Sequence, residues 1–224
     1  MNTRTRTVVF ALALSANAAA ADEPLSNPFY TSTPMSASAA LSTLKPESKA
    51  LEVISFWREA GPALWFAKDA AFDERFRKRF ILDYEAAARG ELVQWQSTPD
   101  GALALLILLD QFPRNAFRDT PRMYATDSMA RKVAMTALSM GFDQTFPQEL
   151  QKFFILPFAH SEDLADQERA VAFARRMSAD DLAHAEHHRD IVKRFGRFPH
   201  RNKILGRTST PEEQHYLDNG GYAG

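Results

Sequence analysis

The chain has 224 residues, of which 45% are hydrophobic and 25% are charged, as expected for one ordinary globular domain. Its net charge is −1, so no overall electric field attracts it to nucleic acid, and we expect no nucleic-acid partner. Because the sequence contains no Cys, disulfides, thiolate nucleophiles and Cys-ligated zinc are excluded.

The first residues have the pattern of a secretory signal peptide. Arg4 and Arg6 precede an apolar stretch (8–16), and a run of small residues ends at Ala21. This order predicts a signal peptide over 1–21 and a periplasmic or secreted protein. The apolar stretch is shorter than the roughly 18 residues that span a bilayer, so we expect no membrane span after cleavage. If translation starts further along the chain, the protein is cytoplasmic.

The rest of the chain divides at Pro46. Residues 22–45 are rich in Ser, Thr and Pro, which predicts a flexible lead-in with little core. From Pro46, helix start and stop signals follow one another, and they predict a single all-helical domain over 46–218. The Gly-rich tail (219–224) is expected to fray.

The first expected helix runs from Pro46 to just before Gly61, and Trp65 and Phe66 follow on a short piece that should enter the core. The next helix, over 70–89, has an aromatic residue at every fourth position. The stripe consists of Phe72, Phe76, Phe80 and Tyr84. Such a stripe indicates core packing, and Gly90 should end this helix.

A short helix over 91–96 and a central helix come next. Thr98 should cap the central helix, and its residues 101–109 are apolar on nearly every side. Their Ala and Leu content favours a helix over a strand, and a helix that is apolar all round should lie at the centre of the domain. Pro113 should end it.

Further helices are expected to the end of the domain. They cover 126–140, 147–154, 161–177 with Ser161 as N-cap, 178–195, and a short piece from Thr210. Alternating strand patterns are missing from the sequence. We therefore predict an all-α protein of antiparallel helix pairs, either an α-solenoid or a compact helical bundle.

Two similar polar segments lie far apart in the chain, and the first follows an apolar run. The first Arg–Asn motif (105–122) and the second Arg–Asn motif (197–211) each contain Phe-Pro, then Arg-Asn, then Arg, then Thr-Pro. We interpret both as helix-end loops that meet at one site. Alternatively, their Arg and Asn side chains only tie helix ends together, or the repetition reflects duplicated architecture.

Several segments resemble the bacterial domain-of-unknown-function family 924. They are 108–115, 158–163, 188–191, 194–202 and 205–213. The resemblance covers about residues 50–218 and implies a tetratricopeptide-like helical fold. It implies no activity.

The motifs supply groups suited to anion recognition. Arg offers a planar fork for carboxylate or phosphate, and Asn offers a donor and an acceptor. The candidate ligand-binding residues are Asp110, Arg114, Asn115, Arg118, Arg197, His200, Arg201 and Asn202. We expect an anionic small molecule or peptide as partner and no cofactor. His184 and His188 have no third ligand in the pattern, so no metal site is expected.

Two functions fit this set of residues. The first is a binding or scaffold module that recognises an anionic or polar ligand through its Arg, Asn and His loops. The alternative is a hydrolase-type enzyme that acts on an anionic small molecule. In that enzyme His160 or His188 would serve as acid or base beside Glu162 or Asp163.

Overall fold

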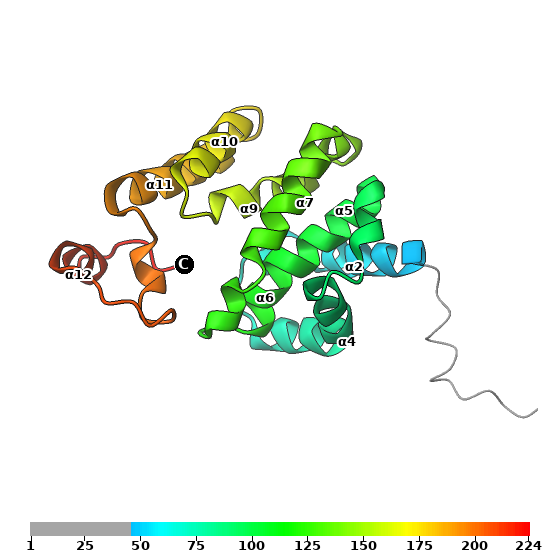
Figure 1. Cartoon of the computed structure of the whole chain (residues 1–224), viewed down its shortest axis with the longest axis horizontal. Coiled ribbons are helices and arrows are strands. Elements are labelled where there is room, and N and C mark those ends of the chain that lie inside the picture. The colour runs from blue at the N-terminus through cyan, green and yellow to red at the C-terminus, as the bar shows by residue number, and fades with distance from the viewer. Residues whose placement is uncertain (1–45) are drawn as a thin grey trace, which may run out of the picture.

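The computed structural model describes residues 46–224, and within this range the chain forms helices, turns and loops without a β-strand (Figure 1). The predicted all-α fold class is confirmed. The predicted signal peptide (1–21) and lead-in (22–45) lie outside the described residues. No helix in the described part combines the length and apolar character needed to cross a membrane.

The N-terminal part of the core is aromatic. Helices α2 (Pro46–Ala60) and α4 (Ala70–Ala88) are joined through the single turn α3 (Pro62–Trp65). The predicted stripe on α4 is buried, each of its four rings being at most 2% exposed. Trp65 is buried as expected and donates a hydrogen bond to the Trp57 carbonyl (2.6 Å). Phe66, expected in the core, is instead 58% exposed because α3 ends one residue before it.

The centre of the molecule is one continuous helical segment. After the 3-10 turn η2 (Val93–Ser97), it comprises α5 (Pro99–Leu106), the π-helical turn η3 (Ile107–Gln111) and α6 (Phe112–Ala116). Thr98 caps α5 as predicted, accepting from the Gly101 N–H (3.2 Å). A Cβ on Gly101 would lie 2.1 Å from the Trp95 carbonyl oxygen, so only glycine fits there. Every residue from 101 to 113 is buried.

Pro113 does not end the central helix, which continues to Ala116. A proline removes one helical N–H and crowds the carbonyl four residues earlier. Here the helix widens first, because the Phe112 N–H bonds back to the Ile107 carbonyl, five residues earlier. The Leu109 carbonyl, which Pro113 cannot serve, accepts from the Thr126 hydroxyl (2.6 Å). The π turn and a distant hydroxyl thus accommodate the proline.

Six short elements follow the central segment. They are η4 (Pro121–Tyr124), α7 (Asp127–Ser139), η5 (Phe142–Thr145), α8 (Gln148–Gln151), η6 (Lys152–Phe154) and α9 (Leu156–Ala159). Helix α7 packs on α5 and on α9, which leads toward the C-terminal part (Figure 1).

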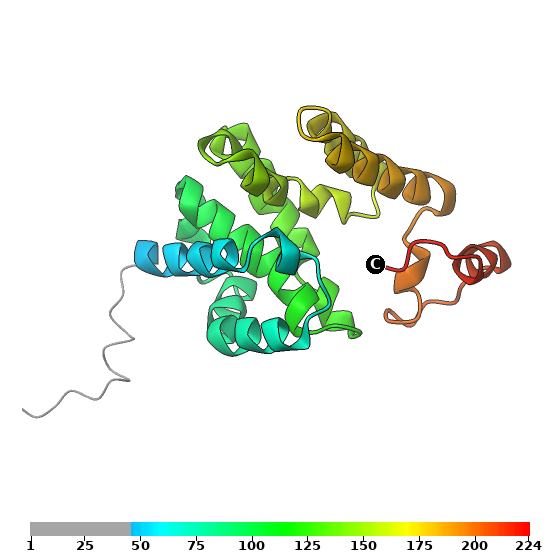
Figure 2. The same ribbon diagram turned by 180° about the vertical axis from the view of Figure 1, so that it is seen from behind.

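The C-terminal part begins with a helix pair. Helices α10 (Leu164–Ala174) and α11 (Ala179–Phe195) lie side by side, as the view from behind also shows (Figure 2). The prediction of Ser161 as the N-cap of this helix is wrong by two residues. Asp163 caps α10 instead, accepting from the Ala165 N–H (2.8 Å), and the Ser161 hydroxyl accepts from the Asp163 N–H (3.2 Å). A carboxylate can take both free N–H groups of the first turn, which favours Asp163.

The last elements form a small apolar cluster of their own with the end of α11. They are η7 (Pro199–Arg201) and α12 (Pro211–Asp218). The tail, expected to fray, instead packs back on the C-terminal part. The Tyr222 N–H donates to the Tyr216 hydroxyl (2.9 Å), and the Tyr222 ring lies 4.8 Å from that of His188, measured between ring centres. The C-terminus consequently lies in the middle of both views rather than at an edge (Figures 1 and 2).

Candidate functional site

The two Arg–Asn motifs meet in space, at a carboxylate that belongs to neither. Asp127, the first residue of α7, accepts hydrogen bonds from Nη1 and Nη2 of Arg114, at 2.8 and 3.0 Å. From the second motif, Nη1 of Arg201 lies 3.9 Å from Oδ2 of Asp127. Both guanidinium groups also stand over the Tyr124 ring, at 5.8 Å for Arg114 and 4.6 Å for Arg201.

A buried Asp–His pair adjoins these arginines. Asp110 lies in η3 and is 1% exposed, and His160 lies just after α9. His160 Nδ1 is 2.9 Å from Oδ1 of Asp110, and the Gln111 side chain donates to Oδ2 at 2.6 Å. Arg114 approaches the same carboxylate at 3.2 Å. Asp110 is thus held from three sides.

The charges of this pair follow from its surroundings. Burial raises the pKa of Asp110, but Arg114 and His160 outweigh it and lower the pKa to about 2. Burial and then Arg114 lower the pKa of His160, against the opposing effect of Asp110. Near pH 7 the pair therefore consists of a carboxylate and a neutral imidazole. We call Asp110, Arg114, Tyr124, Asp127, His160 and Arg201 the arginine site.

Arg201 is the least satisfied member of the arginine site. The residue is 7% exposed, and its guanidinium is stacked between Phe198 (4.5 Å) and Tyr124 (4.6 Å). Its Nε has no hydrogen-bond partner. Burial and then the neighbouring Arg114 lower its pKa, which reflects an environment poor in compensating charge.

The remaining polar residues of the first motif brace the fold. Asn115 Nδ2 donates to Oδ1 of Asp73 (2.8 Å), and Arg118 donates to both oxygens of Asp73 (2.6 and 3.1 Å). Arg118 also donates to the Ala67 carbonyl (2.9 Å). Asp73 lies in the first turn of α4, so these contacts tie the end of α6 to the start of α4.

The second motif repeats this arrangement on Glu213. Arg197 donates to both oxygens of Glu213 (2.6 and 2.8 Å), and Asn202 Nδ2 donates to Oε2 at 3.3 Å. The same carboxylate completes a capping box with Thr210 at the start of α12. Each motif therefore uses one Asn and one Arg on a helix-end acid and directs another Arg, Arg114 or Arg201, to Asp127, whereas Arg207 of the second motif pairs with Glu162.

Glu162, a predicted acid–base candidate, is occupied within the fold. Its oxygens accept from Nη1 and Nη2 of Arg207 (2.7 and 2.9 Å), and Oε1 also accepts from the Phe198 N–H (2.9 Å). Burial raises its pKa, but Arg207 and the Phe198 N–H outweigh it and lower the pKa. Glu162 thus holds the second motif as an ionised brace.

His188 and His200 lie in an aromatic cluster beside the arginine site. The Tyr222 ring is 4.8 Å from His188 and 5.1 Å from His200, and Phe198 is 5.4 Å from His188. Neither nitrogen of His188 has a hydrogen-bond partner. Burial, then His160, lower the pKa of His188 to about 3. Burial, then Arg201, lower the pKa of His200 to about 4. Both rings are neutral near pH 7.

Of the predicted residues, Asp110, Arg114, His160 and Arg201 come together in one site. Asn115, Arg118, Arg197 and Asn202 lie in the two braces. Sequence reasoning missed Asp127 and Tyr124, since Asp127 reads simply as a helix start. It also missed Tyr222, because a Gly-rich end gives no packing signal.

No group of three or more His, Asp or Glu side chains among residues 46–224 is placed to hold a metal ion.

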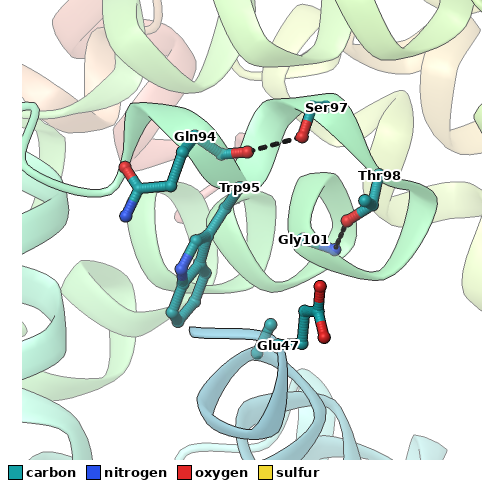
Figure 3. Close-up of a pocket in the computed structure, with 7 residues that line it drawn as sticks. Glu47, Gln94, Trp95, Ser97, Thr98 and Gly101 are labelled. Atoms are coloured by element: carbon teal, nitrogen blue, oxygen red, sulfur yellow. Dashed lines mark hydrogen bonds between the residues drawn. The ribbon is translucent and has the colours of Figure 1, made fainter. Parts of the chain in front are cut away.

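Two cavities of the structure lie outside the arginine site. One, of about 410 Å³, lies between α2 and η2–α5 and is lined by Glu47, Ala50, Gln94, Trp95, Ser97, Thr98 and Gly101 (Figure 3). The other, of about 450 Å³, is lined by His187, Arg194, His215, Tyr216 and residues 219–222. Tyr222 belongs to this second cavity and also covers His188 and His200, so it separates the cavity from the buried histidines.

Comparisons with known proteins found one solved structure and one protein family that resemble the chain. A solved structure described as a protein of unknown function from Agrobacterium tumefaciens is 52% identical, covers 79% of this chain and 100% of its own, and superposes with a TM-score of 0.77. The search of curated proteins gave no match. The model of the family described as "Bacterial protein of unknown function (DUF924)" matches residues 53–221, and the chain belongs to this family.

Proposed function

We propose that the protein is a binding module for a small anionic group, which it holds at the arginine site between Arg201, Arg114 and His160. The observation that carries the proposal is the state of Arg201. A buried charge costs free energy unless it is paired and hydrogen-bonded. Arg201 is 7% exposed, yet its Nε is unpartnered and its ion pair to Asp127 is 3.9 Å long.

The neighbouring acids are already engaged. Asp127 is paired through both oxygens with Arg114, and Asp110 is held by His160, Gln111 and Arg114. Arg201 therefore has donors to spare and no carboxylate of its own. A carboxylate or phosphate oxygen from outside would complete its hydrogen bonds, as guanidinium groups do in anion-binding sites.

The neighbouring histidines leave the arginines as the cations of the site. His160, His188 and His200 all have lowered pKa values, so they add no positive charge near pH 7, and the charge that attracts an anion comes from Arg201 and Arg114. The site also reaches the surface, because the side chains of His160 and Arg114 are 17% and 14% exposed. A small anion can approach from that side without unfolding the braces.

Isothermal titration calorimetry with inorganic phosphate and with succinate tests this proposal. We expect the full chain to bind at least one of them, and Arg201→Met to weaken that binding at least tenfold. Arg118→Ala is the matched control, since it removes an arginine of the Asp73 brace and should leave the affinity unchanged. The proposal fails if the wild-type chain binds neither anion, or if Arg201→Met binds as tightly as the wild type.

We also propose export of the protein, supported by the basic, apolar and small-residue order of residues 1–21. N-terminal sequencing of the protein from an expressing bacterium checks this. Mature protein should begin near Asp22, and a protein that retains Met1 would contradict export.

A further inference from the structure

We propose that the arginine site hydrolyses a phosphate monoester, with His160 as the general base that takes a proton from water and Asp110 as its positioning residue. This inference rests on the proposed anion binding and adds a reaction to it. It also names the anion, because the phosphoryl group would be both the part that is bound and the part that reacts.

The geometry fixes which nitrogen of His160 can act. Nδ1 lies 2.9 Å from the Asp110 carboxylate, which can only accept, so Nδ1 carries the proton. The lone pair is then on Nε2. Asp110 cannot swing away, because it is 1% exposed and also held by Gln111 and Arg114. A base oriented by a fixed carboxylate is the arrangement that general-base catalysis needs.

The environment also keeps His160 ready to accept a proton. A general base must be neutral before the reaction, and burial and Arg114 lower its pKa. Once Nε2 takes a proton, the buried Asp110 carboxylate stabilises the imidazolium. The side chain of His160 is 17% exposed, so water can reach it.

The chain offers water as the nucleophile. It contains no Cys, and the hydroxyl of the neighbouring Ser161 accepts from the Asp163 N–H in a residue that is 3% exposed. His160 removes a proton from water, and the oxygen forms a bond to phosphorus. The ester P–O bond breaks on the opposite side of phosphorus, the leaving alkoxide takes a proton from solvent, and His160 returns its proton to solvent. The products are an alcohol and inorganic phosphate, and no oxidant or reductant is needed.

The two arginines supply charge to this reaction. Negative charge shifts among the phosphoryl oxygens as the bonds change, and guanidinium donors beside them stabilise it. Arg201, with its unpartnered Nε, is free to serve the phosphoryl group, whereas Arg114 also holds Asp110 and Asp127. Binding should therefore depend mainly on Arg201 and proton transfer on His160.

Steady-state hydrolysis of 4-nitrophenyl phosphate by the full chain tests the inference. We expect His160→Gln to lower kcat at least 100-fold with KM within threefold of the wild-type value. Asp110→Asn should also lower kcat, because it no longer fixes the proton on Nδ1, and Arg201→Met should mainly raise KM. His184→Gln, on the exposed face of α11, is the matched control and should retain the wild-type kcat.

Chemical modification of the wild-type chain provides a second test that does not depend on the folding of a variant. Diethyl pyrocarbonate should modify His160 in the folded wild-type chain, and loss of hydrolysis should follow modification of that residue as mapped by mass spectrometry. Inorganic phosphate should protect both. Hydrolysis that survives complete modification of His160, or an unaltered kcat in His160→Gln, overturns the inference.

The calorimetric titration separates this inference from the proposed function. If the chain binds phosphate through Arg201 but does not hydrolyse 4-nitrophenyl phosphate, the anion-binding proposal is supported and the catalytic inference is contradicted. A chain that neither binds phosphate or succinate nor hydrolyses the ester contradicts both.

Discussion

Arg114 and Arg201 both lie close to the Asp127 carboxylate, but at unequal distances. Nη1 of Arg114 is 2.8 Å from Oδ1 of Asp127, and Nη1 of Arg201 is 3.9 Å from Oδ2. This inequality predicts opposite effects on stability. Arg114→Met leaves Asp127 and Asp110 without their cation and should lower the free energy of unfolding by about 3–5 kcal/mol. Arg201→Met removes a buried charge that has little compensation, so it should be neutral or stabilising by up to roughly 4 kcal/mol.

Urea denaturation of both variants at pH 7 measures the difference. The two substitutions are of the same type and lie in the same site, so each serves as control for the other. A large loss of stability in Arg201→Met would mean that Arg201 is a structural brace, like Arg118 and Arg197.

The buried histidines should make the fold sensitive to mild acid. His188 has a pKa of about 3 in the folded chain, against an ordinary value of 6.5. As pH falls from about 6.5 toward 3, the unfolded chain takes up a proton that the folded chain refuses, and stability is lost. The loss from one such group is about 1.4 kcal/mol per pH unit.

His188→Phe keeps a ring in the aromatic cluster and removes this proton. We therefore expect its free energy of unfolding to fall less steeply than that of the wild type between pH 6 and 4.5. His200, with a pKa of about 4, should maintain part of the slope in both proteins. Denaturation curves collected across this range give the slopes, and identical slopes would argue against a buried, neutral His188.

Tyr222 should control how buried these histidines are. Its ring covers both His188 and His200, at 4.8 and 5.1 Å, and borders the cavity of about 450 Å³. In Tyr222→Ala, water from the cavity should reach both rings, and their pKa values should rise toward 6.5 because the desolvation that lowers them is relieved. NMR titration of the imidazole signals measures the shift. Unchanged titration would show that the tail does not shield them.

The Thr126 hydroxyl should contribute to stability because Pro113 has no N–H to donate to the Leu109 carbonyl. Thr126→Val keeps the side-chain shape but leaves the buried Leu109 carbonyl without its donor, at a cost of about 1–3 kcal/mol. Pro113→Ala restores a backbone N–H that can bond to the same carbonyl. Thr126→Val should therefore cost less in a Pro113→Ala background, and thermal unfolding of the four proteins in this cycle provides the coupling. If Thr126→Val destabilised the protein equally in both backgrounds, the proposed coupling between Thr126 and Pro113 would be contradicted.

The helical elements could be predicted because their signals are local. The aromatic stripe on α4, the Thr98 cap and the all-apolar segment at 101–109 depend on neighbours within one or two turns, and the structure confirms each. The continuation of the helix past Pro113 cannot be predicted from its neighbours, because it depends on Thr126, which comes thirteen residues later and donates to the Leu109 carbonyl. No local pattern contains that information.

The candidate site was predictable in part for the same reason. The repeated motif identified Arg114 and Arg201, and the structure brings them together at Asp127. The sequence could not separate the bracing arginines from these two, because the distinction lies in which acid each one meets. Arg118 pairs with Asp73, which lies far from it in the sequence. Arg197 pairs with Glu213, which lies at the start of another helix. Both pairings therefore depend on the tertiary fold.

The π turn at Ile107–Gln111 has a consequence for the orientation of the site. One additional residue in a helix rotates everything after it by about 100° relative to what precedes it. Helix α5 is buried on every side, and Arg114 in α6 must point at Asp127. The widened turn sets the angular phase of α6 separately from that of α5. Closing this turn to ordinary α geometry would therefore rotate Arg114 away from Asp127.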